Sequence, residues 1–299
     1  MLVLFSLAFA AFGSMETILL LGINIIVNYA AAMLLDQIEE SKHKARIYVL
    51  FIDVTLNIAT LFCFKYLAWS LGLLNSWFGI NLSAPNLLLP LGISFFTFRS
   101  LSYVCDVYFG IGKANRNIIY VALYISCFPQ LISGPITRYA DFETTAQNKT
   151  SLAAFSEGIW LFSVGITKKV IIANNIAPLV DTAFGTLGGS RTVLAAWLGA
   201  IGYLIQLYFD FSGYSDMAVG LSKMFGLPCA QNFNYPYCAA SIREYWQRWH
   251  ISLYNWFRVY MFTPLQFSLK RKGYSTVKAT VISMFAVWVF TGIWHGAGL

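Results

Sequence analysis

Charged residues are scarce in this sequence of 299 amino acids. Lysine, arginine, aspartate and glutamate together make up only 11%, against roughly a quarter of an ordinary soluble domain. So few charges cannot cover the surface of a water-soluble fold. Hydrophobic residues reach 58% and aromatic residues 17%, and amphipathic rings favour membrane interfaces and ligand cavities. The composition therefore predicts an integral membrane protein.

Residues that bind metals or form disulfides are also few. The five cysteines are odd in number, form no C-x-x-C pair and lie mostly in apolar stretches, so neither a disulfide framework nor a zinc site is indicated. There is no Walker loop, and Gly213-Tyr-Ser-Asp is followed by Met217 where the G-x-S-x-G nucleophile pattern requires a second glycine. We therefore expect no metal and no serine-hydrolase site.

Apolar runs near the length that crosses a bilayer, about 20 residues, recur along the chain. Because helices that pack together in a membrane form one bundle, we expect a single domain over residues 1–299. The predicted runs cover residues 18–35, 47–74, 87–108, 118–131, 152–172, 193–225 and 277–294, and a shorter run covers 2–12.

The formal net charge of +7 would raise the question of nucleic acid in a soluble protein. Here the basic residues lie between apolar runs, a pattern typical of cytoplasmic loops. Loop 36–46 and the segment around 113–116 are basic, whereas segment 75–86 carries no charge. We therefore expect the first two on the cytoplasmic side, the third outside, and no nucleic-acid partner.

Two of the apolar segments contain polar groups, which are costly at membrane depth and usually mark a pathway or a site. In segment 128–138, Pro129 and Pro135 each remove a backbone donor and must break or kink a helix. In segment 208–216, Asp210 and Asp216 lie within a long apolar run. We expect these carboxylates to line a polar cavity or to pair with nearby bases.

Segment 241–258 has apolar residues at steps of three and four, which predicts one amphipathic helix in the headgroup region. His250 falls on its buried side, four residues after Trp246 and three before Leu253. The local pattern leaves two interpretations of His250 open, a hydrogen-bonded core residue and a catalytic group.

His295 lies at the end of the last apolar run, among glycines that let a substrate or another backbone approach closely. An apolar setting disfavours the imidazolium, and a neutral imidazole can take a proton from a hydroxyl. General-base catalysis and a structural hydrogen bond between helices both fit this sequence. The third histidine, His43, lies in a charged loop and is expected to be solvated.

Taken together, these segments resemble the membrane-bound O-acyltransferase family, in particular its branch of alginate O-acetylation and D-alanyl-lipoteichoic acid transfer proteins. The matching motifs occur in order over roughly residues 15–299. They are Leu89-Pro-Leu-Gly-Ile-Ser-Phe-Phe-Thr-Phe98, Leu101-Ser-Tyr, Asp106-Val-Tyr, Phe128-Pro-Gln-Leu-Ile-Ser-Gly-Pro135, Tyr208-Phe-Asp-Phe-Ser-Gly-Tyr-Ser-Asp216, Trp249-His-Ile-Ser-Leu253, Trp256-Phe-Arg258 and Trp294-His-Gly-Ala297.

The resemblance implies an all-α, polytopic transmembrane bundle with broken, re-entrant and interfacial helices. It implies that His295 is the catalytic base, that His250 is a second site residue, and that an acyl group passes to a hydroxyl through a tunnel. Polar and aromatic residues of the motifs are candidates to line that tunnel, namely Asp210, Ser212, Asp216, Gln130, Arg138, Trp249 and Trp294.

The resemblance further implies an acyl donor such as acetyl-CoA or an acyl-carrier thioester, and no tightly bound cofactor. The partners it implies are a polysaccharide acceptor such as alginate and a separate extracytoplasmic acetyltransferase, at a bacterial inner membrane. The motif wording favours acetylation over D-alanyl transfer to teichoic acid, and a non-catalytic transport subunit stays an alternative. Relatives of this kind extend further at both ends, so we expect the chain to be incomplete there.

Overall fold

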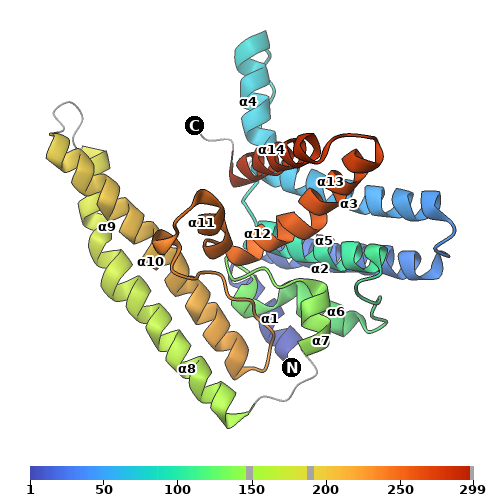
Figure 1. The fold of residues 1–299 in the computed structure, drawn as a ribbon, viewed down its shortest axis with the longest axis horizontal. Helices are drawn as coiled ribbons and strands as arrows, with labels where there is room; N and C mark the ends of the chain where they lie inside the picture. The colour runs from blue at the N-terminus through green and yellow to red at the C-terminus, as the bar shows by residue number, and fades with distance from the viewer. Residues whose placement is uncertain (86, 146–150, 187–191, 297–299) are drawn as a thin grey trace. The chain divides into compact units, whose positions relative to one another are not determined.

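The computed structural model describes residues 1–85, 87–145, 151–186 and 192–296, and every regular element in these ranges is a helix (Figure 1). Five helical segments are long and apolar enough to cross a membrane: Met15–Gln37, His43–Lys65, Leu152–Gly185, Val193–Met224 and Thr276–His295. The predicted all-α, multi-pass membrane fold is therefore confirmed. The chain divides into two compact units, which are described separately.

Unit 1 comprises residues 1–132, 138–143 and 253–299. Its helices are α1 (Leu2–Ala11), α2 (Met15–Gln37), α3 (His43–Lys65), α4 (Leu67–Phe78), α5 (Ile93–Phe109), α6 (Ile118–Ser126), the 3₁₀ turn η1 (Phe128–Gln130), the first turn of α7 (Tyr139–Thr145), the π-helical η5 (Arg258–Phe262), α13 (Thr263–Arg271) and α14 (Thr276–His295).

Unit 2 comprises residues 133–137 and 144–252. Its helices are α8 (Leu152–Ile166), the π-helical η2 (Thr167–Ala173), α9 (Asn174–Asp181), η3 (Thr182–Thr186), α10 (Val193–Met224), the 3₁₀ turn η4 (Pro236–Cys238) and α11 (Ile242–Arg248). Helix α12 (Ile251–Phe257) begins in unit 2 and continues into unit 1.

Two predicted runs differ from the helices that form. The run 47–74 is divided at Tyr66 into α3 and α4. The run 87–108 becomes α5 only from Ile93, because Pro90 and the left-handed Gly92 (φ 70°) precede it. A Cβ on Gly92 would lie 2.1 Å from the carbonyl oxygen of Leu131, so this turn requires glycine both for its conformation and for close contact.

Helix α5 is the core of unit 1 and packs against α2, α3 and α6. Most of its residues are buried, including polar ones. Ser100 Oγ donates to Asn24 Oδ1 of α2, Asn24 Nδ2 donates to Asn57 Oδ1 of α3 (2.8 Å), and Asn57 Nδ2 donates to Asn28 Oδ1 (3.1 Å). These amides satisfy one another where lipid and packed side chains offer no water.

Arg46 joins the ends of two helices in unit 1. Its Nη1 donates to the carbonyl oxygens of Leu35 (2.8 Å) in the last turn of α2 and of Ile38 (3.1 Å) at its C-cap, and its Nη2 donates to that of Tyr108 (3.0 Å) in α5. A guanidinium at helix C-termini binds orphan carbonyls and complements the helix dipoles. The two basic segments predicted to be cytoplasmic thus lie at the same end of unit 1, while their side of the membrane stays a prediction.

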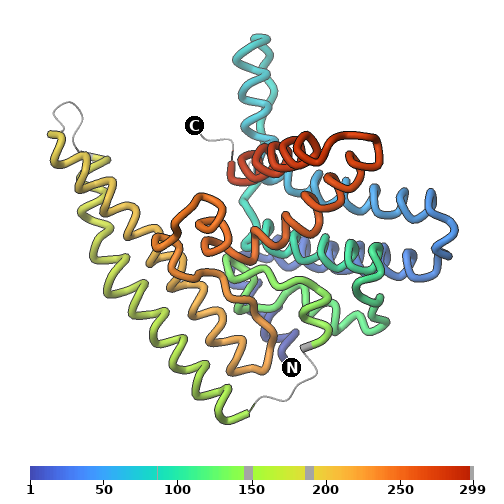
Figure 2. The backbone as a smooth tube through the Cα atoms, in the orientation of Figure 1, coloured from blue at the N-terminus to red at the C-terminus, as the bar shows by residue number. Residues whose placement is uncertain are grey.

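Unit 2 is built on the antiparallel pair α8 and α10, which run side by side (Figure 2). Glycines allow the two backbones to touch. A Cβ on Gly158 would lie 2.7 Å from the carbonyl oxygen of Gly220, and one on Gly165 would lie 2.5 Å from that of Gly213. Small residues at matching positions are a common way for membrane helices to pack closely.

We predict that Gly165→Leu separates α8 from α10, because backbone cannot move aside as a flexible side chain can. Overpacking costs typically about 1–3 kcal/mol, so the melting temperature in detergent should fall clearly. Gly22→Leu in α2 is the matched control, since no heavy atom lies within 4 Å of a Cβ there. Equal melting temperatures for the two variants would contradict this account of the helix pair.

Candidate functional site

His295 is the last residue of α14. Its Nδ1 lies 2.8 Å from the carbonyl oxygen of Thr291, one turn earlier. A carbonyl can only accept, so Nδ1 carries the proton and the neutral ring presents its lone pair at Nε2. The side chain is exposed, contrary to the expected apolar burial. The backbone hydrogen bond, rather than burial, therefore orients this imidazole, and its role as a catalytic base stays a prediction.

Trp294, beside His295, is where several motifs of unit 1 meet. The Phe98 ring packs edge-on against Trp294 with centroids 5.1 Å apart, and against Trp256 at 4.6 Å. Trp256 Nε1 donates to the carbonyl oxygen of Phe98 (3.0 Å). Lys65 Nζ, at the end of α3, donates to the carbonyl oxygen of Trp294 and lies 5.5 Å from the centre of its ring. Side chains of α3 and α5 thus contact the end of α14 that carries His295, and Trp256 of α12 packs on Phe98 behind them.

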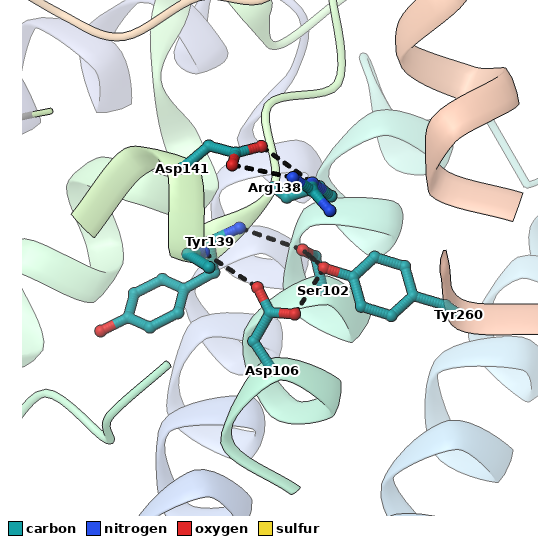
Figure 3. A network of polar contacts seen from close by, with 7 residues as sticks. Ser102, Asp106, Arg138, Tyr139, Asp141 and Tyr260 are labelled. Carbon is teal, nitrogen blue, oxygen red and sulfur yellow. Dashed lines mark hydrogen bonds and ion pairs between the residues drawn. The ribbon is translucent and has the colours of Figure 1, made fainter. Parts of the chain in front are cut away.

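A second polar network holds the segment around residue 139 and η5 against α5 (Figure 3). The carboxylate of Asp106 accepts from Tyr260 Oη (2.7 Å) and from the backbone N–H of Ala140 (2.9 Å). Ser102 Oγ lies 2.6 Å from Tyr260 Oη and accepts from the N–H of Tyr139 (3.1 Å). Four hydrogen bonds therefore join three segments that are far apart in the sequence.

Arg138, a predicted tunnel residue, makes a bidentate ion pair with Asp141, at 2.8 Å for both Nε and Nη2 (Figure 3). This pair raises the pKa of the guanidinium, first through the hydrogen bonds that Arg138 donates to Asp141. Gln130, another predicted tunnel residue, is buried in η1. Helix α6 ends at Ser126 and residues 131–138 are not helical, so the predicted break around Pro129 and Pro135 is confirmed.

Arg99 of α5 was missed by the sequence analysis, although a charge inside an apolar run is itself a signal. Its side chain is 1% exposed, and its guanidinium lies 4.7 Å from the centre of the Tyr124 ring. In the described part of the chain, none of its three nitrogens has a hydrogen-bond acceptor. Arginine stays charged in proteins, so unit 1 buries a cation against the Tyr124 ring and near the Cys127 thiol, with no carboxylate paired to it among the described residues.

We predict that Arg99→Met stabilises the chain against heat. Burying an ion costs several kcal/mol, whereas a desolvated cation–π contact stabilises by about 2 kcal/mol. Replacing the guanidinium by an apolar side chain should therefore raise the melting temperature in detergent. Arg138→Met, which removes the ion pair with Asp141, is the opposite control and should lower it slightly. A lower melting temperature for Arg99→Met would mean that the guanidinium is stabilised by groups other than Tyr124.

His250 belongs to unit 2 and is buried, as predicted. The prediction of one amphipathic helix over 241–258 is wrong, because the chain breaks at Trp249 and His250 between α11 and α12. His250 has φ +46°, a left-handed conformation that is costly for a residue with a side chain. A tertiary contact replaces the helix here, since the N–H of Ile251 donates to the carbonyl oxygen of Asn232 (2.9 Å).

Asn232 is a second residue that the sequence analysis missed. Its Oδ1 lies 3.1 Å from His250 Nδ1 and accepts from the Oγ (2.9 Å) and the N–H (3.2 Å) of Ser252. Its Nδ2 donates to Ser215 Oγ of α10 (3.0 Å). All four residues are buried. No periodic pattern marks Asn232, because it lies in an irregular segment.

Trp249, a predicted tunnel residue, lies in an aromatic cluster of unit 2. Its ring stacks on Tyr245 (centroids 5.8 Å apart) and meets Phe233 edge-on (5.1 Å). Phe211 of α10 contacts the His250 ring edge-on at 4.8 Å. Tyr237 and Tyr245 also line an open hollow of about 450 Å³. Aromatic faces therefore surround the backbone break and limit how the His250 ring can turn.

Asp210 and Asp216 are both paired, as expected. Lys169 makes an ion pair with Asp210, and Lys168 makes one with Asp216 (2.5 Å). Both lysines lie in the π-helical η2, and α10 runs unbroken through both aspartates. Ser212, between them, is buried and its Oγ has no hydrogen-bond partner in the described ranges. These carboxylates join two helices, and their role in a tunnel stays a prediction.

Glu244 holds the start of α11. It accepts from the N–H of Ala240 (2.8 Å) and from Nε and Nη2 of Arg248 (2.9 and 2.7 Å). These contacts, the backbone amide of Ala240 first, lower the pKa of Glu244 below its usual 4.5. A lowered pKa in the folded state gives stability that is present above pH 4.5 and is lost as the pH falls through the folded value.

We therefore predict that acid weakens α11 through Glu244. The melting temperature, followed by tryptophan fluorescence, should fall less between pH 6 and pH 3 in Glu244→Gln than in the unchanged chain. Glu40→Gln, in the exposed loop before α3, should leave the pH difference unchanged. Identical pH differences in all three proteins would mean that this carboxylate contributes nothing to folding.

Comparison with known proteins gives a family and its relatives. The sequence profile described as "MBOAT, membrane-bound O-acyltransferase family" matches residues 113–299. A probable alginate O-acetylase of Azotobacter vinelandii is 41% identical over 82% of this chain and 49% of its own length, and one of Pseudomonas fluorescens is 46% identical over 72% and 42%. A peptidoglycan O-acetyltransferase of Helicobacter pylori is 33% identical over 99% of the chain and 60% of its own length.

The alignments also bear on the extent of the chain. It spans about half the length of the alginate O-acetylases that it matches. A teichoic acid D-alanyltransferase of Bacillus subtilis is similar at a lower level, 31% identical over 71% of the chain and 55% of its own length. The matches therefore extend across the branch named from the motifs and favour its acetyl-transferring members.

Proposed function

The chain belongs to the membrane-bound O-acyltransferase family, and from that premise we propose that it transfers an acetyl group toward O-acetylation of a cell-surface or exported polysaccharide such as alginate. The observation that carries the proposal is the geometry of His295, whose Nδ1 donates to the carbonyl oxygen of Thr291 and whose Nε2 carries the lone pair. In its neutral form, an imidazole fixed in this way has its lone pair at Nε2, as a general base requires.

The chemical step follows from that protonation state. Nε2 of His295 takes the proton of the acceptor hydroxyl while the hydroxyl oxygen attacks the acyl carbonyl carbon. The new C–O bond forms, the C–S bond of the donor thioester breaks, and the leaving thiolate takes the proton back from the imidazolium. His295 is thus unchanged after each transfer. The donor is acetyl-CoA or an acyl-carrier thioester.

His250 is proposed as the second site residue, which orients the acceptor or shares its proton. The residues proposed to line the tunnel are those predicted from the sequence. Trp249 and Trp294 directly precede the two histidines and pack against other aromatic rings. Gln130 and Ser212 are buried polar residues, the first at the helix break around Pro129. A separate extracytoplasmic acetyltransferase then moves the acetyl group from the hydroxyl acetylated at His295 to the polymer, at a bacterial inner membrane.

Acetyl transfer is favoured over D-alanyl transfer by the identities of the relatives, 41–46% for alginate O-acetylases against 31% for the Bacillus subtilis D-alanyltransferase. A transport subunit without catalysis is the alternative from another class. The two differ in what they require of His295. A transport role tolerates a neutral hydrogen-bonding side chain, whereas a base must gain and lose a proton.

We predict that His295→Gln abolishes O-acetylation. The chain and its variants are expressed at matched membrane levels in cells that lack their own polysaccharide O-acetylase, and acetyl esters on the surface polysaccharide are measured. General-base catalysis contributes typically about 10²–10⁴-fold, so acetyl content should fall at least to that extent.

His43→Gln is the matched control, because this histidine is exposed at the start of α3. It should restore acetylation as fully as the unchanged chain. Equal acetylation with His295→Gln and with the unchanged chain would rule out His295 as the base and would favour the transport alternative. Because the chain spans half of its relatives, the same pair of substitutions in a full-length alginate O-acetylase serves as the reference for activity.

A further inference from the structure

We infer that Asn232 is the positioning residue that fixes the tautomer and the orientation of His250. The inference concerns a residue that no motif singled out, and its catalytic meaning rests on the proposed function. Its physical content, the position of one proton on one ring, does not depend on that function.

The first step is the orientation of the Asn232 amide. Oxygen and nitrogen of an amide are assigned from their surroundings, and here the surroundings differ on the two sides. One amide atom faces the backbone N–H of Ser252, which can only donate, so that atom is the oxygen. The other faces Ser215 Oγ at 3.0 Å, a hydroxyl that accepts from the NH₂ group.

The second step concerns the ring. His250 Nδ1 lies 3.1 Å from an oxygen that has no proton to give, so the contact is a hydrogen bond only when Nδ1 is protonated. The neutral ring therefore has its proton on Nδ1 and its lone pair on Nε2. This is the tautomer that Thr291 imposes on His295, reached by a side chain instead of a backbone carbonyl.

The third step concerns the backbone. Asn232 also accepts the N–H of Ile251 at its carbonyl oxygen (2.9 Å), and the next turn of the same segment is held by the N–H of Asn234 donating to the carbonyl oxygen of Arg248 (2.9 Å). These bonds enclose Trp249 and His250 and hold the left-handed φ of +46°. Strain of this kind persists only where the surroundings fix it. Asn232 thus holds both the backbone and the ring of His250.

The experiment determines by NMR which ring nitrogen of His250 carries the proton. The chain contains three histidines, so a ¹⁵N-histidine-labelled sample in lipid nanodiscs gives three ring systems, assigned with His43→Gln and His295→Gln. Nitrogen chemical shifts distinguish a protonated from an unprotonated ring nitrogen. We expect neutral His250 to carry its proton on Nδ1 in the unchanged chain, and to shift toward the Nε2–H form in Asn232→Ala.

Two further variants separate positioning from general disruption. Asn232→Asp keeps an acceptor oxygen against Nδ1 and should retain the Nδ1–H form. Ser215→Ala removes the partner of Nδ2 but leaves both Ser252 donors on Oδ1, and should retain it too. An Nδ1–H ring that persists in a folded Asn232→Ala variant would overturn the inference.

The unchanged chain alone can also overturn it, by showing His250 with its proton on Nε2, so the test does not require that Asn232→Ala folds. The spectra need no turnover, which keeps this inference apart from the proposed function. If the tautomer follows Asn232 while His295→Gln still acetylates polysaccharide, positioning stands and the proposed base is wrong. If acetylation is lost in His295→Gln but the His250 tautomer is the same in the unchanged chain and in Asn232→Ala, the proposed function stands and this inference fails.

Discussion

The carboxylate of Asp106 is the group on which the polar interior of unit 1 depends. It is 1% exposed in the helix at the centre of the unit, and it binds both the hydroxyl of Tyr260 and the N–H of Ala140. The first N–H groups of α7, which follows the break around Pro129 and Pro135, have no partner within their own helix. Asp106 and its neighbour Ser102 accept from two of these groups, so the break that the prolines create is tolerated at this position.

Much of the fold could be predicted from the sequence because membrane insertion is governed by local composition. Apolar length alone located the segments that became α2, α3, α10 and α14. The cost of charge at membrane depth predicted that Asp210 and Asp216 would line a polar cavity or be paired, and both are paired. The proline spacing predicted the break after α6 for an equally local reason. The prediction of the histidines came from motif resemblance, since their local surroundings left alternatives open.

What the sequence could not reveal depends on contacts between distant residues. The 3.6-residue pattern of 241–258 is real, yet a hydrogen bond from Ile251 to Asn232 interrupts the helix. The glycine pairs of α8 and α10 form only when two helices are aligned, and Asn232 gains its role from Ser215 and Ser252. Arg99 is different, because its charge was visible in an apolar run and only its burial beside Tyr124 needed the structure.

Arg46 has one role during membrane insertion and another in the folded structure. During synthesis its charge, with its basic neighbours, contributes to the orientation in which the early helices insert, and for that purpose any cation serves. Only after residues 93–109 have emerged can its planar fork reach the carbonyl oxygen of Tyr108 as well as those of Leu35 and Ile38. Lysine would preserve the first use and lose the second, because a point charge cannot span two helix ends. One side chain thereby serves two successive steps, first the orientation of the helices in the membrane and then the hydrogen bonding of the carbonyl oxygens at the ends of α2 and α5.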